Sequence, residues 1–311
     1  MADQFFDESR FLHKAEMGLG AWSWGDRSLW NYGLGYTDAD IEEAFHTSLS
    51  AGVNLIDTAE VYGSGRSERL LGLFMKTAQT PVLVATKFMP YPWRLNHKAL
   101  ENALRHSLER LGLERVDLYQ INWPFPPYPV ETWVEEIAKV AKAGLTRAVG
   151  VSNYDKNQMQ RAFTVLIGVN VPLASNQVEY HLLNRLVEKN GLLDRCKELG
   201  VRLIAYSPMA KGFLTGKYTP EMPPPGVRGN GAVVKLKRIQ PLIDLMSEIG
   251  MGHDGKSPAQ VALNWIICKG ALPIPGAKTA KQAAQNVGAI GWRLTPEEVK
   301  ALDNGSDKVT K

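Results

Sequence analysis

The sequence is poor in cysteine, with only Cys196 and Cys268 among its 311 residues. Neither belongs to a CxxC pair, and two distant thiols do not make a disulfide framework. This usage is typical of proteins from reducing compartments. A chain of this length can bury a full hydrophobic core without disulfides or structural metal ions.

The sequence also lacks a long hydrophobic run. None of its apolar segments approaches the ~20 residues that a membrane-spanning helix requires. The segment Met1 to Arg10 carries acidic residues and has no apolar signal core. We therefore expect no membrane contact and a cytoplasmic protein, or a stromal one if a plastid transit peptide has been removed.

An excess of charge of one sign is missing too. There are 36 Lys and Arg residues against 32 Asp and Glu, a formal net charge of +4, without a dense basic stripe. Nucleic acid is therefore not an expected partner. The contents of 44% hydrophobic and 22% charged residues exclude a disordered chain and a coiled coil.

What the sequence does contain is an alternation of short apolar runs with longer amphipathic ones. Continuous apolar strands suit a parallel sheet that helices cover on both faces. The apolar runs are Glu16–Gly20, Val53–Ile56, Pro81–Ala85, Val116–Ile121, Leu145–Val151, Pro172–Ser175, Val201–Ala205 and Ala271–Ile274. Eight strand–helix pairs predict an α/β protein with a (β/α)₈ TIM barrel, as a single domain over residues 1–311.

Two features of this alternation need separate comment. A doubly wound sheet also alternates, but its glycine fingerprint is missing, because Gly18-Leu19-Gly20 continues with Ala21-Trp22-Ser23. The amphipathic runs include Leu95–Leu111, Val187–Leu199 and one long stretch from Val234 to Lys269. An irregular loop, Tyr218 to Gly231, follows the seventh strand on the catalytic face of barrels, and we expect either a lid or a disordered insertion there.

Polar residues follow the predicted strands at the end where barrel active sites lie. Asp57 ends the second strand, Tyr62 follows in the loop, and Lys87 ends the third strand. A nearby lysine lowers the pKa of a tyrosine from its ordinary value of about 10, and a carboxylate would keep that lysine charged. Such a tyrosine can protonate a carbonyl oxygen as hydride reaches the carbon. The alternative is a core tyrosine and an unrelated buried ion pair.

Other catalytic patterns are missing from the sequence. Gly150-Val151-Ser152-Asn153-Tyr154 lacks the last glycine of a nucleophile elbow. No HExxH, no histidine pair at metal spacing and no Walker loop occurs, so we expect no metal site. His181 follows a rim segment, and we interpret it as a structural histidine. A barrel hydrolase or isomerase is disfavoured because it would need paired carboxylates, metal ligands or a phosphate loop.

Six motifs, in order from about Met17 to Asp303, resemble those of the aldo-keto reductases. They are Asp57–Gly63 (DTAEVYG), Ala85–Lys87 (ATK), Asp117–Gln120 (DLYQ), Gly150–Tyr154 (GVSNY), Ala205–Pro208 (AYSP) and Ile274–Ala277 (IPGA). The segments Trp22–Asp26, Pro208–Tyr218 and Gly288–Leu294 look most like plastid or cyanobacterial-type members. The resemblance implies a (β/α)₈ barrel that binds a nicotinamide dinucleotide without a Rossmann fold and reduces aldehydes and ketones to alcohols with NADPH.

The resemblance also implies a role for each residue that matches a family motif. Tyr62 would be the general acid, tuned by Lys87 and Asp57. Ser152, Asn153 and Gln177 would hold the nicotinamide carboxamide, and Tyr206 would stack on the ring. The other cofactor residues would be Trp22, Ser207, Met209, Gly212, Leu214, Lys217, Gly276, Lys278, Gln282, Gln285 and Asn286. Many members have Lys and Arg where Gly276 and Gln282 stand here, so Lys278 would take over the phosphate contact and favour NADPH over NADH.

One catalytic position departs from the family pattern. Asn122 stands where the motif after the fourth strand has a histidine. An amide can donate a hydrogen bond to a carbonyl oxygen, but it cannot take up a proton. Potassium-channel β subunits resemble this variation and turn over slowly. We expect carbonyl orientation to survive and rate or substrate range to suffer, and the alternative function is a slow-turnover NADP-binding redox sensor or regulatory subunit.

Aromatic residues at the predicted rim bear on the substrate. Trp24 and Trp123 are assigned to the substrate pocket, with Phe125 and Tyr128 nearby in the sequence. They indicate a small carbonyl compound that is apolar or aromatic; the alternative is that they only pack the loops together. The sequence carries no signal for an oligomeric state.

Overall fold

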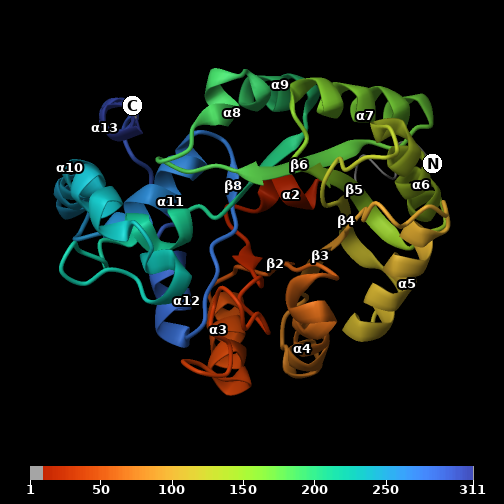
Figure 1. Ribbon diagram of the computed structural model, residues 1–311, viewed down its shortest axis with the longest axis horizontal. Coiled ribbons are helices and arrows are strands. Elements are labelled where there is room, and N and C mark those ends of the chain that lie inside the picture. The colour runs from red at the N-terminus through yellow and green to blue at the C-terminus, as the bar shows by residue number, and fades with distance from the viewer. Residues whose placement is uncertain (1–9, 311) are drawn as a thin grey trace.

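The computed structural model describes residues 10–310 and contains one sheet of eight parallel strands in chain order. The strands are β1 (Leu19–Gly20), β2 (Leu55–Asp57), β3 (Leu83–Phe88), β4 (Val116–Ile121), β5 (Thr146–Ser152), β6 (Leu173–Glu179), β7 (Arg202–Tyr206) and β8 (Leu272–Pro273). The sheet curls so that its ends meet: the Gly18 amide donates to the Pro273 carbonyl at 3.0 Å, and the Gly20 amide to the Pro275 carbonyl at 3.0 Å. Figure 1 shows the helices arranged around the outside, which is the predicted (β/α)₈ arrangement.

The helices alternate with the strands along the chain. They are α2 (Phe11–Lys14), α3 (Asp38–Ser50), α4 (Arg66–Phe74), α5 (Ala99–Leu111), α6 (Val130–Lys142), α7 (Lys156–Gly168), α8 (Leu186–Lys189), α9 (Leu192–Leu199), α10 (Ala232–Gly252), α11 (Pro258–Cys268), α12 (Ala280–Val287) and α13 (Pro296–Thr310). Short 3₁₀ segments are η1 (Tyr62–Gly65), η2 (Met75–Thr77), η3 (Ala210–Thr215) and η4 (Gly226–Gly229). None of the helices within residues 10–310 combines the length and the apolar character that crossing a bilayer requires.

Two of the predicted helical runs are wrong in that each is two helices. The run from Val234 to Lys269 divides into α10 and α11, because Ser257 begins a new helix with a capping box that involves Gln260. The run from Val187 to Leu199 divides at Gly191, whose φ of 75° interrupts the helix between α8 and α9.

Residues inside the barrel form a small apolar cluster. It contains Leu12, Leu55, Ala85, Leu118, Ala148, Ala174, Ile204, Leu272 and Ile274. Leu12 of α2 is fully buried, and Arg202 at the start of β7 donates to the Ala15 carbonyl, so α2 covers the amino-terminal end of the barrel. The opposite, carboxyl end is therefore the open one.

Inward-facing positions become polar toward that carboxyl end. Two residues after Leu55, Ala85 and Leu118, the same faces of β2, β3 and β4 carry Asp57, Lys87 and Gln120, all buried. Burying these groups is costly unless they bond to one another. The strand pleat thus places a polar layer above the apolar one.

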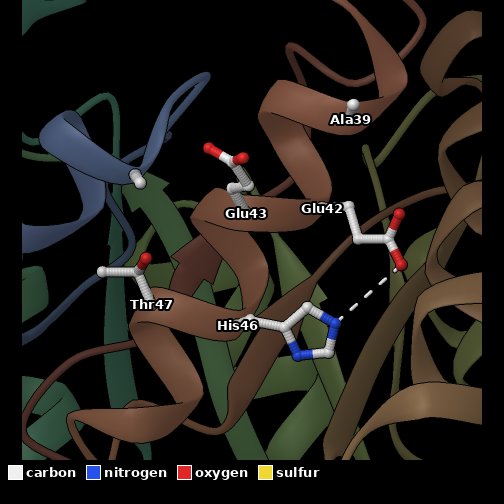
Figure 2. A pocket seen from close by; sticks show the side chains of 6 residues that line it. Ala39, Glu42, Glu43, His46 and Thr47 are labelled. Atoms are coloured by element: carbon white, nitrogen blue, oxygen red, sulfur yellow. Dashed lines mark ion pairs between the residues drawn. The ribbon is translucent and has the colours of Figure 1, made fainter.

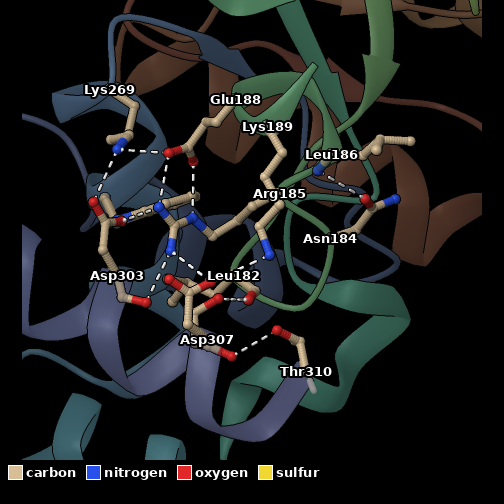
Figure 3. A network of polar contacts seen from close by, with 12 residues as sticks. Leu182, Asn184, Arg185, Leu186, Glu188, Lys189, Lys269, Asp303, Asp307 and Thr310 are labelled. Atoms are coloured by element: carbon tan, nitrogen blue, oxygen red, sulfur yellow. Dashed lines mark hydrogen bonds and ion pairs between the residues drawn. The ribbon is translucent and has the colours of Figure 1, made fainter. Parts of the chain in front are cut away.

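A network of ion pairs fixes the carboxyl-terminal helix. Arg185 contacts Glu188 at 2.8 Å and Asp303 of α13 at 3.3 Å, while Lys269 contacts the same two carboxylates at 2.9 and 3.0 Å. Figure 3 shows Arg185 lying between these acids. The network joins the segment after β6, α11 and α13 and contains none of the predicted site residues.

Candidate active site

Three of the predicted catalytic residues meet at the carboxyl end of β2 and β3. Lys87 Nζ lies 2.5 Å from Asp57 Oδ1, 2.8 Å from the Thr58 carbonyl oxygen and 3.3 Å from Tyr62 Oη. The ammonium group is buried, with 1% of the Lys87 side chain exposed. The parallel pairing of β2 with β3 produces this meeting, because Asp57 lies beside Ala85 and Lys87 follows on the same face.

The pKa of Tyr62 is not lowered overall, although the sequence predicts that Lys87 lowers it. Burial raises the pKa of Tyr62, the Lys87 charge opposes that rise, and the Asp57 charge adds to it, so the net direction is upward. Burial also opposes the charge on Lys87, but attraction by Asp57 and Tyr62 outweighs it, and the pKa of Lys87 is raised. Tyr62 is therefore a neutral phenol beside a charged lysine.

Asp57 also receives hydrogen bonds from two glutamine amides. Gln177 Nε2 donates to Asp57 Oδ2 at 2.7 Å, and Gln120 Nε2 lies 3.5 Å from the same oxygen. Ser175 Oγ donates to Gln120 Oε1 at 3.3 Å. The Gln177 side-chain amide thus donates to the Asp57 carboxylate, and its Oε1 has no partner within residues 10–310. Gln120 was not selected from the sequence, although it lies within the DLYQ motif.

Gly150 makes room for this glutamine layer. A Cβ atom at Gly150 would come within 2.2 Å of Ser175 Oγ and 3.1 Å of Gln120 Cγ. The glycine of the GVSNY motif is therefore explained by close approach inside the barrel rather than by a turn.

The predicted carboxamide-binding residues form one connected group. Asn153 Nδ2 donates to the Asn122 carbonyl at 3.0 Å and to Ser152 Oγ at 3.1 Å. Ser152 Oγ donates to the Gln177 carbonyl at 2.8 Å, and Tyr206 Oη donates to Asn153 Oδ1 at 3.0 Å. Backbone and side-chain contacts thus bring together the ends of β4, β5, β6 and β7.

Asn122 lies beside this group at the end of β4. Its amide nitrogen donates to the Phe88 carbonyl at 2.8 Å, which fixes the backbone next to Lys87. The residue is 7% exposed, and its side-chain amide forms no hydrogen bond with any group in residues 10–310. The amide is therefore available to a ligand.

Two pairs of aromatic residues include Tyr62 itself and the residues that follow Asn122 in the chain. The ring of Trp22 lies near that of Tyr62, with centroids 6.3 Å apart and planes 29° apart. The rings of Trp123 and Phe125 are stacked at 5.5 Å and 5°, and each residue is 37% exposed.

Trp24 does not belong to this rim, contrary to its assignment to the substrate pocket. It is fully buried, its indole nitrogen donates to the Ala277 carbonyl at 3.2 Å, and its ring packs edge-on against Phe45 and Phe74. Although Trp24 is only two residues from Trp22, its side chain lies in the core between β1, α3 and α4.

A basic cluster lies where the segments after β1, β7 and β8 meet. Lys278 Nζ donates to the Trp30 carbonyl at 2.9 Å and lies 4.8 Å from the Trp30 ring centroid. The Arg228 guanidinium lies over the same ring at 5.2 Å. Burial, together with the charges of Arg228 and Lys217, lowers the pKa of Lys278 to about 8, and the Asp26 charge opposes this shift.

Lys278, Arg228 and Lys217 form no ion pair with a carboxylate of residues 10–310. Arg228 Nε is also buried without a hydrogen-bond partner in that range. Lys278 and Arg228 are partly buried and Lys217 is exposed. Partly buried positive charge without a carboxylate partner suits an anion. Arg228 is not among the residues predicted from the sequence, where it is a single arginine in the irregular loop and matches no motif.

That loop, Tyr218 to Gly231, is held in place by Arg228. Arg228 Nη1 donates to the Lys211 carbonyl at 3.2 Å and lies 3.5 Å from Tyr218 Oη. Together with the Trp30 contact, these bonds join the segment after β7 to the segment after β1. These contacts place the loop against the barrel mouth.

The remaining predicted cofactor residues fall into two segments. Ser207, Met209, Gly212, Leu214 and Lys217 lie in and beside η3, where Ser207 and Lys211 have φ of 50° and 56°. Leu214 is fully buried, contrary to its assignment as a cofactor residue, because no atom of it is exposed at the barrel mouth.

The second segment follows β8. Asn286 Nδ2 donates to the Gly276 carbonyl at 3.2 Å, and Gln282 Oε1 accepts from the Lys278 amide at 2.9 Å. The Gln285 carbonyl accepts from Gln260 at 3.1 Å. His181 is buried and bonds locally, with Nδ1 accepting from the Leu183 amide at 3.1 Å and Nε2 lying 3.4 Å from Glu179.

A separate groove lies on the outer wall between α3 and α12. It has a volume of about 520 Å³ and is lined by Ala39, Glu42, Glu43, His46, Thr47 and Ala280. Figure 2 shows Ala39, Glu42, Glu43, His46 and Thr47 on α3, with His46 paired to Glu42. None of the predicted catalytic residues reaches it.

Comparison with known proteins places the chain among reductases. The sequence profile of the aldo/keto reductase family matches residues 16–307. A chloroplastic pyridoxal reductase of Arabidopsis thaliana is 41% identical over 96% of this chain and 85% of its own length. The aldo-keto reductase YhdN of Bacillus subtilis is 30% identical over 94% of this chain and 90% of its own.

Solved structures agree with this placement. The glycerol dehydrogenase AKR11B4 from Gluconobacter oxydans superposes with a TM-score of 0.82 at 28% identity, over 95% of this chain and 93% of its own. An aldo/keto reductase from Klebsiella pneumoniae in complex with NADP and acetate gives a TM-score of 0.72 at 28% identity, over 93% and 90% of the two chains.

Proposed function

Because this chain belongs to the aldo/keto reductase family, we propose that it reduces an aldehyde or ketone to an alcohol with NADPH. The contact of Lys87 Nζ with both Tyr62 Oη and Asp57 carries this proposal. NADPH, when bound, supplies the hydride that adds to the carbonyl carbon. The chain itself has to deliver one proton to the carbonyl oxygen.

Tyr62 is the proton donor. Its raised pKa keeps the phenol protonated at neutral pH, which is the state a general acid needs. As the proton leaves Tyr62 Oη, the Lys87 ammonium stabilises the developing phenolate from 3.3 Å. Asp57 and the Thr58 carbonyl hold the ammonium group in position and keep it charged.

Asn122 orients the carbonyl group. Its side-chain amide has no partner within residues 10–310, so its N–H can donate to the carbonyl oxygen that Tyr62 protonates. The amide does not titrate, so Tyr62 is the single acid in this mechanism.

The residues present suit a nicotinamide dinucleotide phosphate. Ser152, Asn153 and Gln177 offer donors and acceptors for a carboxamide, and Tyr206 offers a ring. The unpaired charges of Lys217, Lys278 and Arg228 would neutralise phosphate groups. The remaining contacts would come from Trp22, Ser207, Met209, Gly212, Gly276, Gln282, Gln285 and Asn286.

For the substrate, we infer a planar aromatic or heteroaromatic aldehyde, with pyridoxal as the first candidate. The 41% identity to a pyridoxal reductase supports this choice. The parallel Trp123 and Phe125 rings beside Asn122 offer a surface on which a flat ring can stack. The regulatory-subunit alternative gains no support, because the relatives are reductases and a dehydrogenase.

Titration with NADPH, followed by addition of pyridoxal or a nitrobenzaldehyde, tests the proposal. We expect loss of nicotinamide absorbance with the native chain. In Tyr62→Phe we expect kcat lower by roughly 10²–10⁴-fold with NADPH affinity unchanged. Most of the activity surviving in Tyr62→Phe would refute the acid role, and the absence of NADPH binding would refute the cofactor site.

A further inference from the structure

Glu60 and Arg94 form a bidentate ion pair beside the proposed catalytic residues. Arg94 Nη1 donates to Glu60 Oε1 at 2.6 Å, and Arg94 Nη2 donates to Glu60 Oε2 at 3.0 Å. The Arg94 side chain is 24% exposed and the Glu60 side chain 10%, so water screens this ion pair less than one on the surface. The parallel arrangement fixes orientation as well as distance.

The pair joins the segment that carries Tyr62 to the strand that carries Lys87. Glu60 lies two residues before Tyr62, and Met89 two residues after Lys87. The Met89 amide donates to Glu60 Oε1 at 2.7 Å, and Arg94 Nη1 donates to the Met89 carbonyl at 2.9 Å. Three hydrogen bonds therefore join the Glu60 side chain to the segment after β3, and the fourth ties Arg94 to Met89 within that segment.

The segment that carries Tyr62 is not part of a long helix or a strand. It is a 3₁₀ segment of four residues in which Gly63 and Ser64 have φ of 54° and 55°. A serine in this region is strained and persists only where its surroundings hold it. The Tyr62–Lys87 contact, at 3.3 Å, lies beyond the usual range of hydrogen bonds, so a small displacement would break it.

We propose that Glu60 and Arg94 are positioning residues that hold the Tyr62 hydroxyl against Lys87. This inference rests on the proposed function, since positioning matters only if Tyr62 transfers a proton. Arg94 also lies 4.9 Å from the Phe88 ring and 5.5 Å from the Tyr91 ring, so it fixes the segment after β3 as well. Neither residue touches the reacting atoms.

The charges that act on Tyr62 come from Lys87 on β3 and Asp57 on β2, and Tyr206 on β7 is a further titratable group coupled to it. Removing Arg94 alone would leave the Glu60 carboxylate unpaired and add negative charge to this set. The double variant Glu60→Gln/Arg94→Gln removes one charge of each sign. It therefore separates loss of geometry from loss of charge.

The chain offers a matched control at the opposite end of the barrel. Arg147 contacts Asp117 at 2.7 Å, the two side chains are 28% and 15% exposed, and the guanidinium lies 5.5 Å from the Phe11 ring. Arg147→Gln breaks an ion pair of similar burial that is remote from Tyr62. Arg94→Lys keeps the charge but loses the bidentate contact.

The experiment measures kcat against pH, NADPH affinity and thermal unfolding for these variants. In the double variant and in Arg94→Gln we expect kcat to fall about tenfold or more, because a displacement near 1 Å costs up to ~10² in rate. We expect the alkaline limb of kcat to move to higher pH, since a more distant Lys87 stabilises the phenolate less. NADPH affinity should change less than about twofold, and Arg94→Lys should recover part of the rate.

Hydrogen exchange of the peptide containing residues 58–65 gives a readout that needs no turnover. It should become faster in Arg94→Gln and stay unchanged in Arg147→Gln. Unchanged exchange, or a kcat loss and pH profile no different from those of Arg147→Gln, would overturn the positioning role. If the native chain reduces no aldehyde, the proposed function fails, and the exchange result still decides whether the pair holds the Tyr62 segment.

Discussion

The Arg228 guanidinium lies over the indole of Trp30, 5.2 Å from its centroid, and this contact joins the segment after β7 to the segment after β1. Lys278, from the segment after β8, approaches the same indole at 4.8 Å. Two cations on one ring, without a carboxylate partner in residues 10–310, repel each other. That repulsion is relieved when an anion binds between them.

The first prediction concerns the choice between NADPH and NADH. Arg228→Gln should weaken NADPH binding about 10–100-fold, because a hydrogen bond to a charged group contributes about 1.5–3 kcal/mol. NADH, which lacks the extra phosphate, should lose less than about twofold. Fluorescence titration of both nucleotides measures the ratio, with Arg238→Gln on the exposed side of α10 as control. Equal losses for the two nucleotides would place Arg228 away from that phosphate.

The second prediction is a pH dependence of cofactor affinity. Burial, together with the charges of Arg228 and Lys217, lowers the pKa of Lys278 to about 8, so above this pH the free protein loses that charge. A bound phosphate favours the protonated lysine and raises its pKa again, so binding above pH 8 takes up a proton. NADPH affinity should therefore fall as pH rises above about 8, more steeply than NADH affinity. In Lys278→Met this difference between the nucleotides should vanish; a slope that persists in this variant would assign the titration to another group.

The strands could be predicted because their apolar runs are continuous, but the apolar runs alone end before the strands do. The run Pro81–Ala85 stops short of the end of β3 at Phe88, since Thr86 and Lys87 are polar. Thr86 bonds to Glu68 and Lys87 to Asp57, so tertiary partners keep these polar residues in the strand. A pattern of hydrophobicity holds no information about such partners.

Some residues of the candidate site could be predicted from sequence motifs, and others could not. Motifs identified Asp57, Tyr62 and Lys87, which the strand register brings together. Arg228 lies in a loop without periodicity, and its contact with Trp30 depends on how that loop folds. Trp24 was misplaced because the chain after β1 turns, with the Trp24 amide donating to the Ala21 carbonyl at 3.0 Å, so a strand-like alternation does not apply there.

The third prediction concerns the polar layer inside the barrel. Gly150→Ala puts a methyl group 2.2 Å from Ser175 Oγ and 3.1 Å from Gln120 Cγ, so one of them has to move. We expect a loss of about 1–3 kcal/mol in the free energy of unfolding, as for other overpacked cores. Denaturant titration measures it, and Gly168→Ala, where a Cβ meets nothing within 4 Å, is the control. A Gly150→Ala protein as stable as the native chain would mean that the glutamine layer tolerates displacement.

The last prediction concerns the amide that replaces the family's histidine. Asn122 can donate a hydrogen bond to the substrate oxygen but brings no charge to it. A protonated imidazole at the same position would stabilise the developing oxyanion more strongly, since charge-assisted hydrogen bonds are about twice as strong as neutral ones. Asn122→His should therefore raise kcat for small aldehydes, and the gain should shrink as pH rises above the ordinary histidine pKa of about 6.5.

Asn122→Ala separates this electrostatic contribution from simple access to the pocket. Without any donor at position 122 the carbonyl loses its orientation, and kcat should fall below the native value while NADPH affinity stays the same. A histidine variant no faster than the native chain, together with an alanine variant that retains the native rate, would show that position 122 does not contact the carbonyl. Tyr62 and Lys87 would then have to orient the substrate as well as protonate it, and the aromatic pair Trp123 and Phe125 would be the remaining candidates for fixing its ring.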